Sequence, residues 1–559
     1  MKKNKKTEIS SAHKTQSLSK SKSNNTEYWI AAGLTLITLV LYSSVSHIGF
    51  FTIDDSTYVT QNALVQHPDK FIWNSFVCQN YHPLTILSLA CNFLSSGTDA
   101  GAYHITNLIL HLINTVLWFV FLIQLTKEKW VSGLIALLFA IHPLHVESVV
   151  WIAERKDVLY TLFFAAGLIL YLKYLNQKKI SWLIITIIVF TLSLLSKPQA
   201  VIFPFLLLLL DYYTARKMDI KMWVEKIPFF ALSLLFGIIA LQSQKDAIAD
   251  PLALMSWSMR PFLAAYEIAL YGLKLLLPFK LSVFYPYPNE PLPFTYYLSA
   301  VILITVLYFI YKFRTNRELV FGSLFFLVCL LPVLQLKPFG AAIIAERYTY
   351  IASIGFFLPL VSFLFKYLKS KKSNFIFAGV LVYCIVLSCI TYGRVSEWSN
   401  NKNLLKSADE NYPSVFIKNT LANLYGTSGN LDSAKWYIDK AISEKPDLPV
   451  LYFTRAHMAG NNLIQGFADI DKAISLDHNY ALAYGFKGLL WANVGNDDSA
   501  FYYLRKSISI RPLSDSYLVM GQLKEKIGQS DSASFYFNKA VMVDPTNLIA
   551  KQKAGIINP

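Results

Sequence analysis

Up to about residue 395 the chain is a succession of long apolar runs, separated by short gaps rich in Lys and Arg. A helix needs about 20 mostly apolar residues to cross a bilayer, and many of these runs approach that length. The hydrophobic fraction of the whole chain is 54%, and its mean hydropathy is +0.40. Soluble globular proteins are about 45–50% apolar, so the excess indicates lipid as the solvent. The sequence predicts an all-α, polytopic membrane helix bundle.

We expect about eleven spans in this bundle. The two weakest, 180–196 and 201–214, are separated by only a few residues, which suits a hairpin of short helices buried in protein. Residues 260–277 are also apolar, but Glu267 and Lys274 make this stretch amphipathic. We therefore expect an interfacial or re-entrant helix there, on the outer side. The expected spans are 28–48, 105–125, 131–150, 158–176, 180–196, 201–214, 227–243, 297–312, 319–336, 347–367 and 374–393.

Three parts follow from the change in pattern along the chain. Residues 1–27 are rich in Lys, Ser and Asn, which predicts a disordered, basic cytoplasmic tail. Residues 28–395 form the transmembrane domain, and no small-residue cleavage site follows its first apolar run. From residue 396 to 559 the chain has the pattern of ordinary amphipathic helices, so we expect a second domain there.

Of the net charge of +16, +14 lies in residues 1–399, and much of that lies in the first 22 residues. From Asn400 onward, 17 basic and 15 acidic residues nearly cancel. Cytoplasmic loops collect Lys and Arg, which predicts an inner-membrane protein with a cytoplasmic N-terminus and its second domain on the periplasmic side. Nucleic-acid binding is not expected, because it would place the basic residues on one folded face. The gaps assigned to the cytoplasm contain Lys127, Lys129, Lys178, Lys179, Arg216, Lys217, Lys221, Lys312, Arg314, Arg317, Lys366, Lys369, Lys371 and Lys372.

Residues 414–547 repeat with a period near 33–34 residues. Each unit has a turn glycine, small residues where two helices cross, and a proline that ends the second helix. This pattern resembles the tetratricopeptide repeat and predicts an α-solenoid of four repeats, the second with a shortened turn. A groove for an extended peptide and a dimerisation or folding module are both open. The recurring residues include Gly429, Gly495, Gly528, Pro413, Pro446, Pro512 and Pro545.

The first outer loop, 49–104, opens with two adjacent carboxylates, Asp54 and Asp55. Carboxylates at a membrane edge are costly to hold desolvated unless they are used, so both are candidate catalytic residues. The alternative interpretation is that the two aspartates are a solvated pair that caps the start of a helix. The same loop contains Cys78 and Cys91, between which a disulfide is an option.

Polar side chains continue toward the second span. His82 stands in Tyr-His-Pro-Leu-Thr, and His104 begins a stretch in which Asn107 and His111 share its helix face. This face should look into the bundle, where it supports a site or joins two helices.

The second outer loop, 142–157, is the densest in polar residues. His142, His145 and Glu147 follow the order His-Pro-x-His-x-Glu, which is no known zinc-hydrolase spacing. The proline also prevents a regular helical display of ligands, so we expect no metal site.

Cations stand at several outer edges, where the charge rule makes them less expected. Arg155 and Lys156 suit a phosphate group, and Asp157 stands beside them. Lys197 follows the fifth span, and the pair Glu346-Arg347 begins the tenth. Anion binding is favoured over membrane anchoring for these outer cations.

Taken together, these motifs resemble the transmembrane and tetratricopeptide repeat-containing O-mannosyltransferase family, as a bacterial-type member. The resemblance covers nearly the whole chain after residue 27. Each motif alone is weak, and their order is what is specific. They are Asp54-Asp55, Tyr81-His-Pro-Leu-Thr, Tyr103-His-Ile-Thr-Asn-Leu, His142-Pro-Leu-His-x-Glu-Ser-Val-x-Trp, Glu154-Arg-Lys-Asp-Val-Leu, Leu194-Leu-Ser-Lys, Leu331-Pro-Val and Ala345-Glu-Arg-Tyr, followed by the repeats.

The resemblance implies a GT-C-type glycosyltransferase that takes mannose or a similar hexose from a polyprenyl or dolichyl phosphate carrier. It passes the sugar, with inversion, to Ser or Thr of an acceptor polypeptide on the outer face. Asp54 or Asp55 would be the base, and Arg155, Lys156, Lys197 and Arg347 would receive the leaving phosphate. Related families carry Asp-Glu at the first motif, so which acid is the base stays open. The supporting polar residues would be His82, His104, His142, His145, Glu147, Asp157 and Glu346.

Metal dependence varies across the GT-C superfamily, so no cofactor is assumed, and a divalent cation stays open. Two other functions also stay open. One is a transferase that modifies lipid or surface glycan. The other is a non-catalytic membrane scaffold or transporter, although a transporter should carry charges near the midplane rather than at the outer edge.

Overall fold

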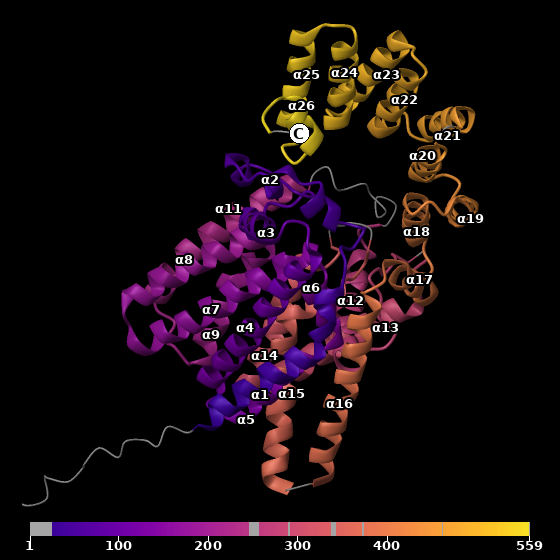
Figure 1. Cartoon of the computed structure of the whole chain (residues 1–559). Coiled ribbons are helices and arrows are strands. Elements are labelled where there is room, and N and C mark those ends of the chain that lie inside the picture. The colour runs from indigo at the N-terminus through magenta and orange to yellow at the C-terminus, as the bar shows by residue number, and fades with distance from the viewer. Residues whose placement is uncertain are drawn as a thin grey trace, which may run out of the picture.

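A computed structural model describes residues 25–244, 256–288, 291–336, 342–371, 374–460 and 462–557. Most of the predicted N-terminal tail, residues 1–24, lies outside the described residues. The described chain is helical, with only isolated bridges and no strands. Figure 1 shows a helix bundle with a curved array of helix pairs at one end. The predicted all-α fold class is confirmed.

The membrane bundle contains helices at all eleven predicted spans. Seven are long and apolar enough to cross a membrane, or eight if the bent pair α5 and Pro143–Val150, with its 54° kink, is one span. The protein is therefore a multi-pass membrane protein. The bundle helices are α1 (Thr26–Leu41), α4 (Ala100–Thr126), α5 (Lys129–Ile141), α6 (Val146–Val150), α7 (Arg155–Gln177), α8 (Ile180–Ser196), α9 (Phe203–Tyr213), α10 (Ile220–Val224), α11 (Ile227–Ser243), α13 (Phe294–Lys312), α14 (Arg317–Leu330), α15 (Thr349–Lys371) and α16 (Asn374–Glu397).

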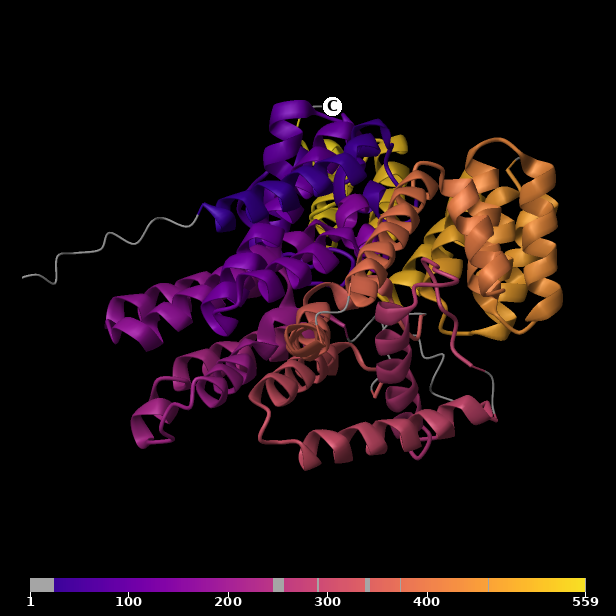
Figure 2. The ribbon, with the colours of Figure 1, turned by 90° about the horizontal axis from the view of Figure 1, so that it is seen from below.

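Two predicted spans end earlier than expected: α1 ends at Leu41 rather than at 48, and α14 ends at Leu330 rather than at 336. The predicted hairpin is made of α8 and the apolar helix Pro198–Tyr213, both too short to pass as full spans. α8 is only partly buried, because its residues Ile184 and Ile188 are exposed on the surface of the bundle. α12 (Arg260–Leu276) is a helix as predicted and is not among the candidate spans. In Figure 2, α13 stands apart from the rest of the bundle.

The basic turns gather at one end of the bundle. Lys369 pairs with Glu128 at 2.9 Å, which joins the end of α15 to the turn before α5. Lys366 pairs with Glu318 at 2.6 Å at the start of α14. The Arg317 guanidinium donates to the Tyr213 carbonyl at 3.4 Å. These contacts agree with the prediction that the basic turns share one side, and the outer loops lie at the opposite helix ends.

The first outer loop contains a helix that the sequence pattern did not predict. It is α3 (Pro83–Ser96), which follows the short elements η2 (Ser56–Thr60), α2 (Ala63–Gln66) and η3 (Lys70–Trp73). α3 is apolar but has only 14 residues, so it falls below the length of a span. Cys78 and Cys91 are both free, so the disulfide that the sequence left as an option is not formed.

The second domain has the four predicted repeats. Its turn glycines adopt the left-handed conformation, with φ of 78° at Gly429 and 79° at Gly495, which few other residues tolerate. The helix pairs are α18 (Val415–Thr427) with α19 (Leu431–Glu444), α20 (Pro449–Met458) with α21 (Leu463–Leu476), α22 (Ala481–Asn493) with α23 (Asp497–Ile510), and α24 (Ser514–Lys526) with α25 (Ser530–Val543), flanked by α17 (Asn401–Asn411) and α26 (Leu548–Lys553).

The repeat array is joined to the bundle at both of its ends. At its start, Phe416 stacks on Phe284 with ring centroids 4.4 Å apart, and Leu421 belongs to the same buried core as the bundle. At its end, the Ala63 N–H donates to the Thr546 carbonyl at 2.8 Å. Figure 1 shows α26 standing over α2, while α17 and α18 lie to the side. The array therefore arches over the outer loops.

Candidate active site

Asp55 joins the first outer loop to the start of α7. Its carboxylate accepts the Phe51 N–H at 2.7 Å and the Ala153 N–H at 2.8 Å. The side chain is fully buried, and burial raises the pKa of Asp55 to about 7, although both N–H donors favour the ionised form. These contacts are those of a residue that holds two segments together.

We expect Asp55→Ala to lower the free energy of unfolding by about 2–4 kcal/mol, because it leaves two buried N–H groups without an acceptor. Thermal unfolding of the detergent-solubilised protein, followed by tryptophan fluorescence, measures the change. Asp54→Ala is the control, and it should shift stability by less than about 0.5 kcal/mol. Equal stability of both variants would contradict the joining role of Asp55.

Asp54 differs from its neighbour. Among the described residues its carboxylate has no hydrogen bond and no ion pair, and the side chain is half-buried. Burial raises the pKa of Asp54 above its usual value of 3.8, while the charges of Lys156 and Arg347 lower it. Asp54 is thus an available carboxylate beside two cations, and of the two predicted acids it is the one that is free to take a proton.

The Glu154 carboxylate contacts three of the four predicted cations. Its carboxylate lies 3.1 Å from Lys156 Nζ, 3.2 Å from Arg347 Nε and 3.9 Å from Lys197 Nζ. Lys156 belongs to the first turn of α7, Lys197 follows α8, and Arg347 lies in η8 (Glu346–Tyr348), just before α15. These elements all meet at the same end of the bundle. The structure therefore brings Lys156, Lys197 and Arg347 into one cluster beside Asp54.

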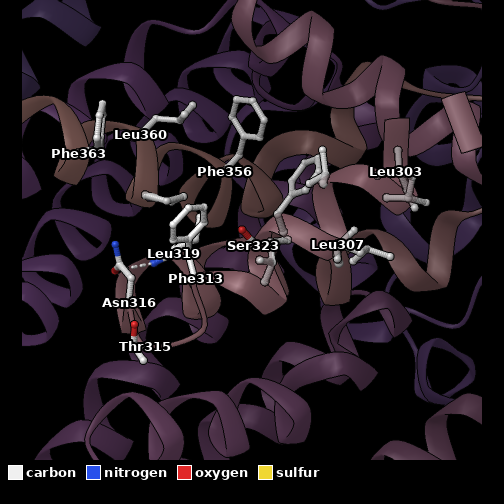
Figure 3. Close-up of a pocket in the computed structure, with 16 residues that line it drawn as sticks. Leu303, Leu307, Phe313, Thr315, Asn316, Leu319, Ser323, Phe356, Leu360 and Phe363 are labelled. Carbon is white, nitrogen blue, oxygen red and sulfur yellow. Dashed lines mark hydrogen bonds between the residues drawn. The ribbon is translucent and has the colours of Figure 1, made fainter. Parts of the chain in front are cut away.

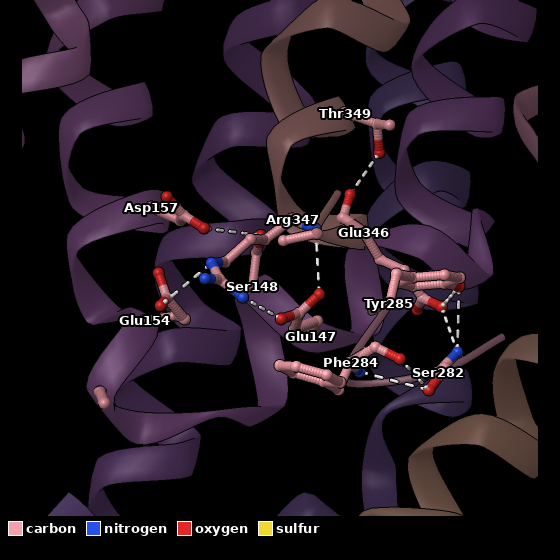
Figure 4. Close-up of polar contacts among 12 residues, drawn as sticks. Glu147, Ser148, Glu154, Asp157, Ser282, Phe284, Tyr285, Glu346, Arg347 and Thr349 are labelled. Carbon is pink, nitrogen blue, oxygen red and sulfur yellow. Dashed lines mark hydrogen bonds and ion pairs between the residues drawn. The ribbon is translucent and has the colours of Figure 1, made fainter. Parts of the chain in front are cut away.

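Two further predicted acids complete this cluster. Glu147 pairs with the Arg347 guanidinium and accepts the Arg347 N–H at 3.1 Å. Asp157 pairs with Lys197 and accepts the Ser148 hydroxyl at 3.0 Å. Figure 4 shows the Arg347 guanidinium between Glu147 and Glu154. The three cations keep about 10–20% of their side-chain surface exposed, so each offers part of its charge to a ligand.

Arg155 is not part of this cluster. Its guanidinium is fully buried and donates to the Ser88 hydroxyl at 3.0 Å, the Asn92 amide oxygen at 2.8 Å and the Tyr103 carbonyl at 3.0 Å. Its Nε donates to Asn107. All four acceptors are neutral groups of α3 and α4. Arg155 therefore fastens these helices to α7, and its predicted phosphate contact has no support in this geometry.

Four of the other predicted residues lie around the cluster rather than in it. Glu346 faces away and accepts the Ser282 N–H at 2.7 Å and the Tyr285 hydroxyl at 2.6 Å. His104 contacts the Gly49 carbonyl at 3.2 Å, His142 the Leu275 carbonyl at 3.0 Å and His145 the Phe139 carbonyl at 2.8 Å. These contacts position outer loops on helix ends.

His82 lies closer to the cations. Its ring stacks on Tyr58, with centroids 5.5 Å apart, and Tyr58 in turn accepts Lys156 Nζ at 3.2 Å. Neither ring nitrogen of this buried histidine has a hydrogen-bond partner among the described residues. Burial and the Lys156 charge lower the pKa of His82 to about 3, so the ring is neutral.

An apolar groove of about 470 Å³ adjoins the cluster. Lys197 and Tyr348 line it together with Leu234, Ile238 and Leu241 of α11, which are exposed on the bundle surface. A second pocket, of about 590 Å³, is shown in Figure 3 and is also apolar. It ends in polar residues at the basic end of the bundle, away from the charged cluster. Of these two pockets, the first is the one that connects apolar surface with the cations.

The described ranges contain no group of three or more His, Cys, Asp or Glu residues arranged to hold a metal ion. Glu154 and Tyr58 were not predicted from the sequence as site residues. An acid placed directly before two cations at the start of a span was the available signal for Glu154. No sequence signal marked Tyr58.

A family model for the tetratricopeptide repeat matches residues 417–448 and 514–547, which are the first and fourth repeats. A protein O-mannosyl-transferase of Caenorhabditis elegans is 26% identical over 447 residues, covering 74% of this chain and 62% of that protein. Protein O-mannosyl-transferase TMTC3 of Homo sapiens is 22% identical over 519 residues, covering 80% and 55%.

The curated relatives of this chain are protein O-mannosyl-transferases. The chain spans about 55–62% of the length of these two relatives. Among solved structures, the Archaeoglobus fulgidus oligosaccharyltransferase aligns with 75% of this chain and 59% of its own, at 11% identity and a TM-score of 0.38. MamA aligns with 28% of this chain and 94% of its own, at 23% identity and a TM-score of 0.23.

Proposed function

We propose that this protein transfers mannose or a similar hexose from a polyprenyl phosphate carrier to Ser or Thr hydroxyls of polypeptides on the outer face of the inner membrane. One observation supports this most: an unpaired carboxylate, Asp54, lies beside three clustered cations at the outer ends of the helices. The names of the curated relatives support the same activity.

Asp54 is the general base in this proposal. The acceptor oxygen attacks the anomeric carbon while its proton passes to the Asp54 carboxylate. The bond between that carbon and the phosphate oxygen breaks, and its electron pair leaves with the lipid phosphate. Attack opposite the leaving group inverts the anomeric configuration. Asp55 holds the Asp54 segment against the short turn just before α7 through its contact with Ala153.

Lys197 and Arg347 receive the departing phosphate, because both keep exposed surface beside the lipid-facing groove. Charge-assisted hydrogen bonds to phosphate oxygens stabilise the negative charge that develops as the bond breaks. The apolar groove along α11 holds the first isoprenoid units of the carrier. Lys156 keeps its contacts with Glu154 and Tyr58, and its charge lowers the pKa of Asp54.

A polypeptide acceptor is favoured over a lipid or surface glycan. The two ends of the repeat array contact the same loop that carries Asp54: Asn401 donates to the Phe50 carbonyl at 3.2 Å, and Lys551 pairs with Asp69 at 2.6 Å. Both ends of a module of a type that binds peptides therefore contact the loop that carries the proposed base. Neither a glycan acceptor nor a scaffold role requires this arrangement.

The donor is tested with the purified protein in nanodiscs and a Thr-containing peptide. We expect transfer from a short-chain polyprenyl phosphate hexose and none from the corresponding nucleotide sugar. Gly237 lines the groove with open space around it, so Gly237→Trp should raise the donor KM by about tenfold with little change in kcat, since it removes ground-state binding.

Gly379 in α16 also has open space around it and lies outside the groove, so Gly379→Trp is the matched control. Turnover with the nucleotide sugar at the same rate would contradict a lipid-linked donor. An unchanged donor KM in Gly237→Trp would remove the groove from the proposal.

A further inference from the structure

A cavity of about 540 Å³ lies where the last repeat meets the first outer loop. One wall consists of Thr57 and the loop from Asn74 to Cys78. The other wall comes from the repeats, with Leu482, the segment Pro512–Asp515 and the segment Met542–Thr546. Polar and apolar groups both line it, and its volume is in the range of ligand sites, roughly 300–1,000 Å³.

The cavity has acidic groups that are not neutralised. Asp515 and Asp544 line it, and neither forms an ion pair with any residue in the described part of the chain. The Asp544 carboxylate is fixed by the Thr546 N–H at 2.9 Å, and Asp515 accepts the Asn547 amide at 3.2 Å. Two oriented carboxylates without a cation favour a positively charged ligand.

The two walls are held in a fixed relation. Lys551 of α26 is fully buried and pairs with Asp69 of the loop at 2.6 Å. The Ala63 N–H donates to the Thr546 carbonyl at 2.8 Å, which forms a bridge between Asn62 and Asn547. A preformed cleft loses less entropy when a flexible chain binds in it.

The cavity lies next to the proposed base. Thr57 is one helical turn after Asp54, because the Tyr58 N–H donates to the Asp54 carbonyl at 3.0 Å. On the same wall, burial raises the pKa of the Cys78 thiol to about 12, and the Asp54 charge adds to this shift. A chain bound in the cavity therefore passes within reach of the Asp54 segment.

We propose that this cleft binds the acceptor polypeptide, and that it selects segments in which basic residues flank a Ser or Thr. The inference rests on the proposed function for its biological meaning, since the bound segment is the acceptor. It adds to that function a location and a charge preference. The last two repeats form the site together with Thr57 and the Asn74–Cys78 loop.

Peptide binding without donor tests this inference separately from catalysis. The probe is a fluorescein-labelled peptide of alternating Thr and Lys, titrated with the full-length protein in nanodiscs and followed by anisotropy. Asp515→Asn and Asp544→Asn should each raise Kd by about fivefold, and the double variant by at least about 20-fold. A peptide with Glu in place of Lys should bind at least about tenfold more weakly than the Lys peptide.

The matched control is Asp531→Asn, an exposed acid of the same repeat that does not line the cavity. It should leave Kd unchanged. Thr57→Arg and Met542→Arg place a cation on either wall, and both should weaken binding. Weakening by Met542→Arg alone would show binding to the repeats only and overturn the shared cleft.

Unchanged binding in the Asp515→Asn, Asp544→Asn double variant, or equal binding of the Glu peptide, would also overturn the inference. The proposed function fails in a different experiment. If Asp54→Asn transferred sugar at the full rate while the Lys peptide bound as expected, the catalytic proposal would fall and the cleft would stand. The same titration in Asp54→Asn should give an unchanged Kd.

Discussion

Asp54→Asn should lower kcat for sugar transfer by roughly 10²–10⁴-fold, because it removes the group that accepts the hydroxyl proton. The Asp54 carboxylate has no partner among the described residues, so the change leaves no buried group unpaired. Stability and the KM values for donor and peptide should therefore stay close to those of the parent. The measurement is initial-rate transfer of labelled hexose to a Thr-containing peptide in nanodiscs.

Asp55→Asn provides the comparison at the neighbouring position. An asparagine can accept only one of the two N–H bonds from Phe51 and Ala153, so a loss of activity should come with a loss of stability. If Asp54→Asn kept full activity while Asp55→Asn lost it without unfolding, the assignment of base and support would be reversed. Full activity in both variants would refute the carboxylate mechanism.

The pH profile gives a second readout of the same prediction. A general base acts only when ionised, so activity should rise with pH through the pKa of Asp54. Burial raises this pKa above the usual 3.8, which shifts the acidic limb to higher pH than for a solvated aspartate. The residual activity of Asp54→Asn should lack this limb. An identical limb in the variant would assign it to another group.

The outer-edge cations could be predicted because they break a rule of membrane topology. Lys197 and Arg347 stand at helix ends where basic residues are scarce, and the structure brings both to Glu154. The positions of the spans were also readable from apolar length, although α1 ends at Leu41 rather than at 48 and α14 ends at Leu330 rather than at 336. α3 was missed for the same reason, because 14 apolar residues are too few to mark a span.

The direction of each side chain could not be predicted. Arg155 and Lys156 are adjacent in sequence, but neighbours on a helix point about 100° apart. Lys156 therefore reaches Glu154, while Arg155 reaches Asn92 of α3, a helix that the pattern did not reveal. For the same reason the sequence could not distinguish the role of Asp54 from that of Asp55. Adjacent acids look alike until the backbone donors that bind one of them are known.

The attachment of the repeats also lay beyond the sequence pattern. The periodicity of about 34 residues defines each helix pair, because contacts within a repeat are local. The contact between Lys551 and Asp69 joins residues 482 positions apart, and no periodic signal records it. Without the contacts at its two ends, the repeat array would be a separate module. With them, it forms one wall of a cavity beside the proposed base.

Glu154→Gln should lower the free energy of unfolding by about 3–5 kcal/mol, since it removes one partner from a buried ionic network. Arg347 keeps Glu147, and Lys197 keeps Asp157, but Lys156 loses its only carboxylate partner among the described residues. Thermal unfolding in detergent measures the effect. Glu318→Gln is the control, because its pair with Lys366 is largely exposed and should contribute at most about 1 kcal/mol.

The same variant tests whether the cations serve a phosphate. Removing the Glu154 charge makes the cluster one unit more positive, so polyprenyl monophosphate should bind to Glu154→Gln more tightly than to the parent, and it should restore part of the lost thermal stability. The measurement is the shift in unfolding temperature with increasing polyprenyl monophosphate, with uncharged polyprenol as the control for chain binding. A destabilised variant that gained no affinity for the phosphate would show that Lys156, Lys197 and Arg347 serve the fold alone. The leaving group would then have to be stabilised elsewhere.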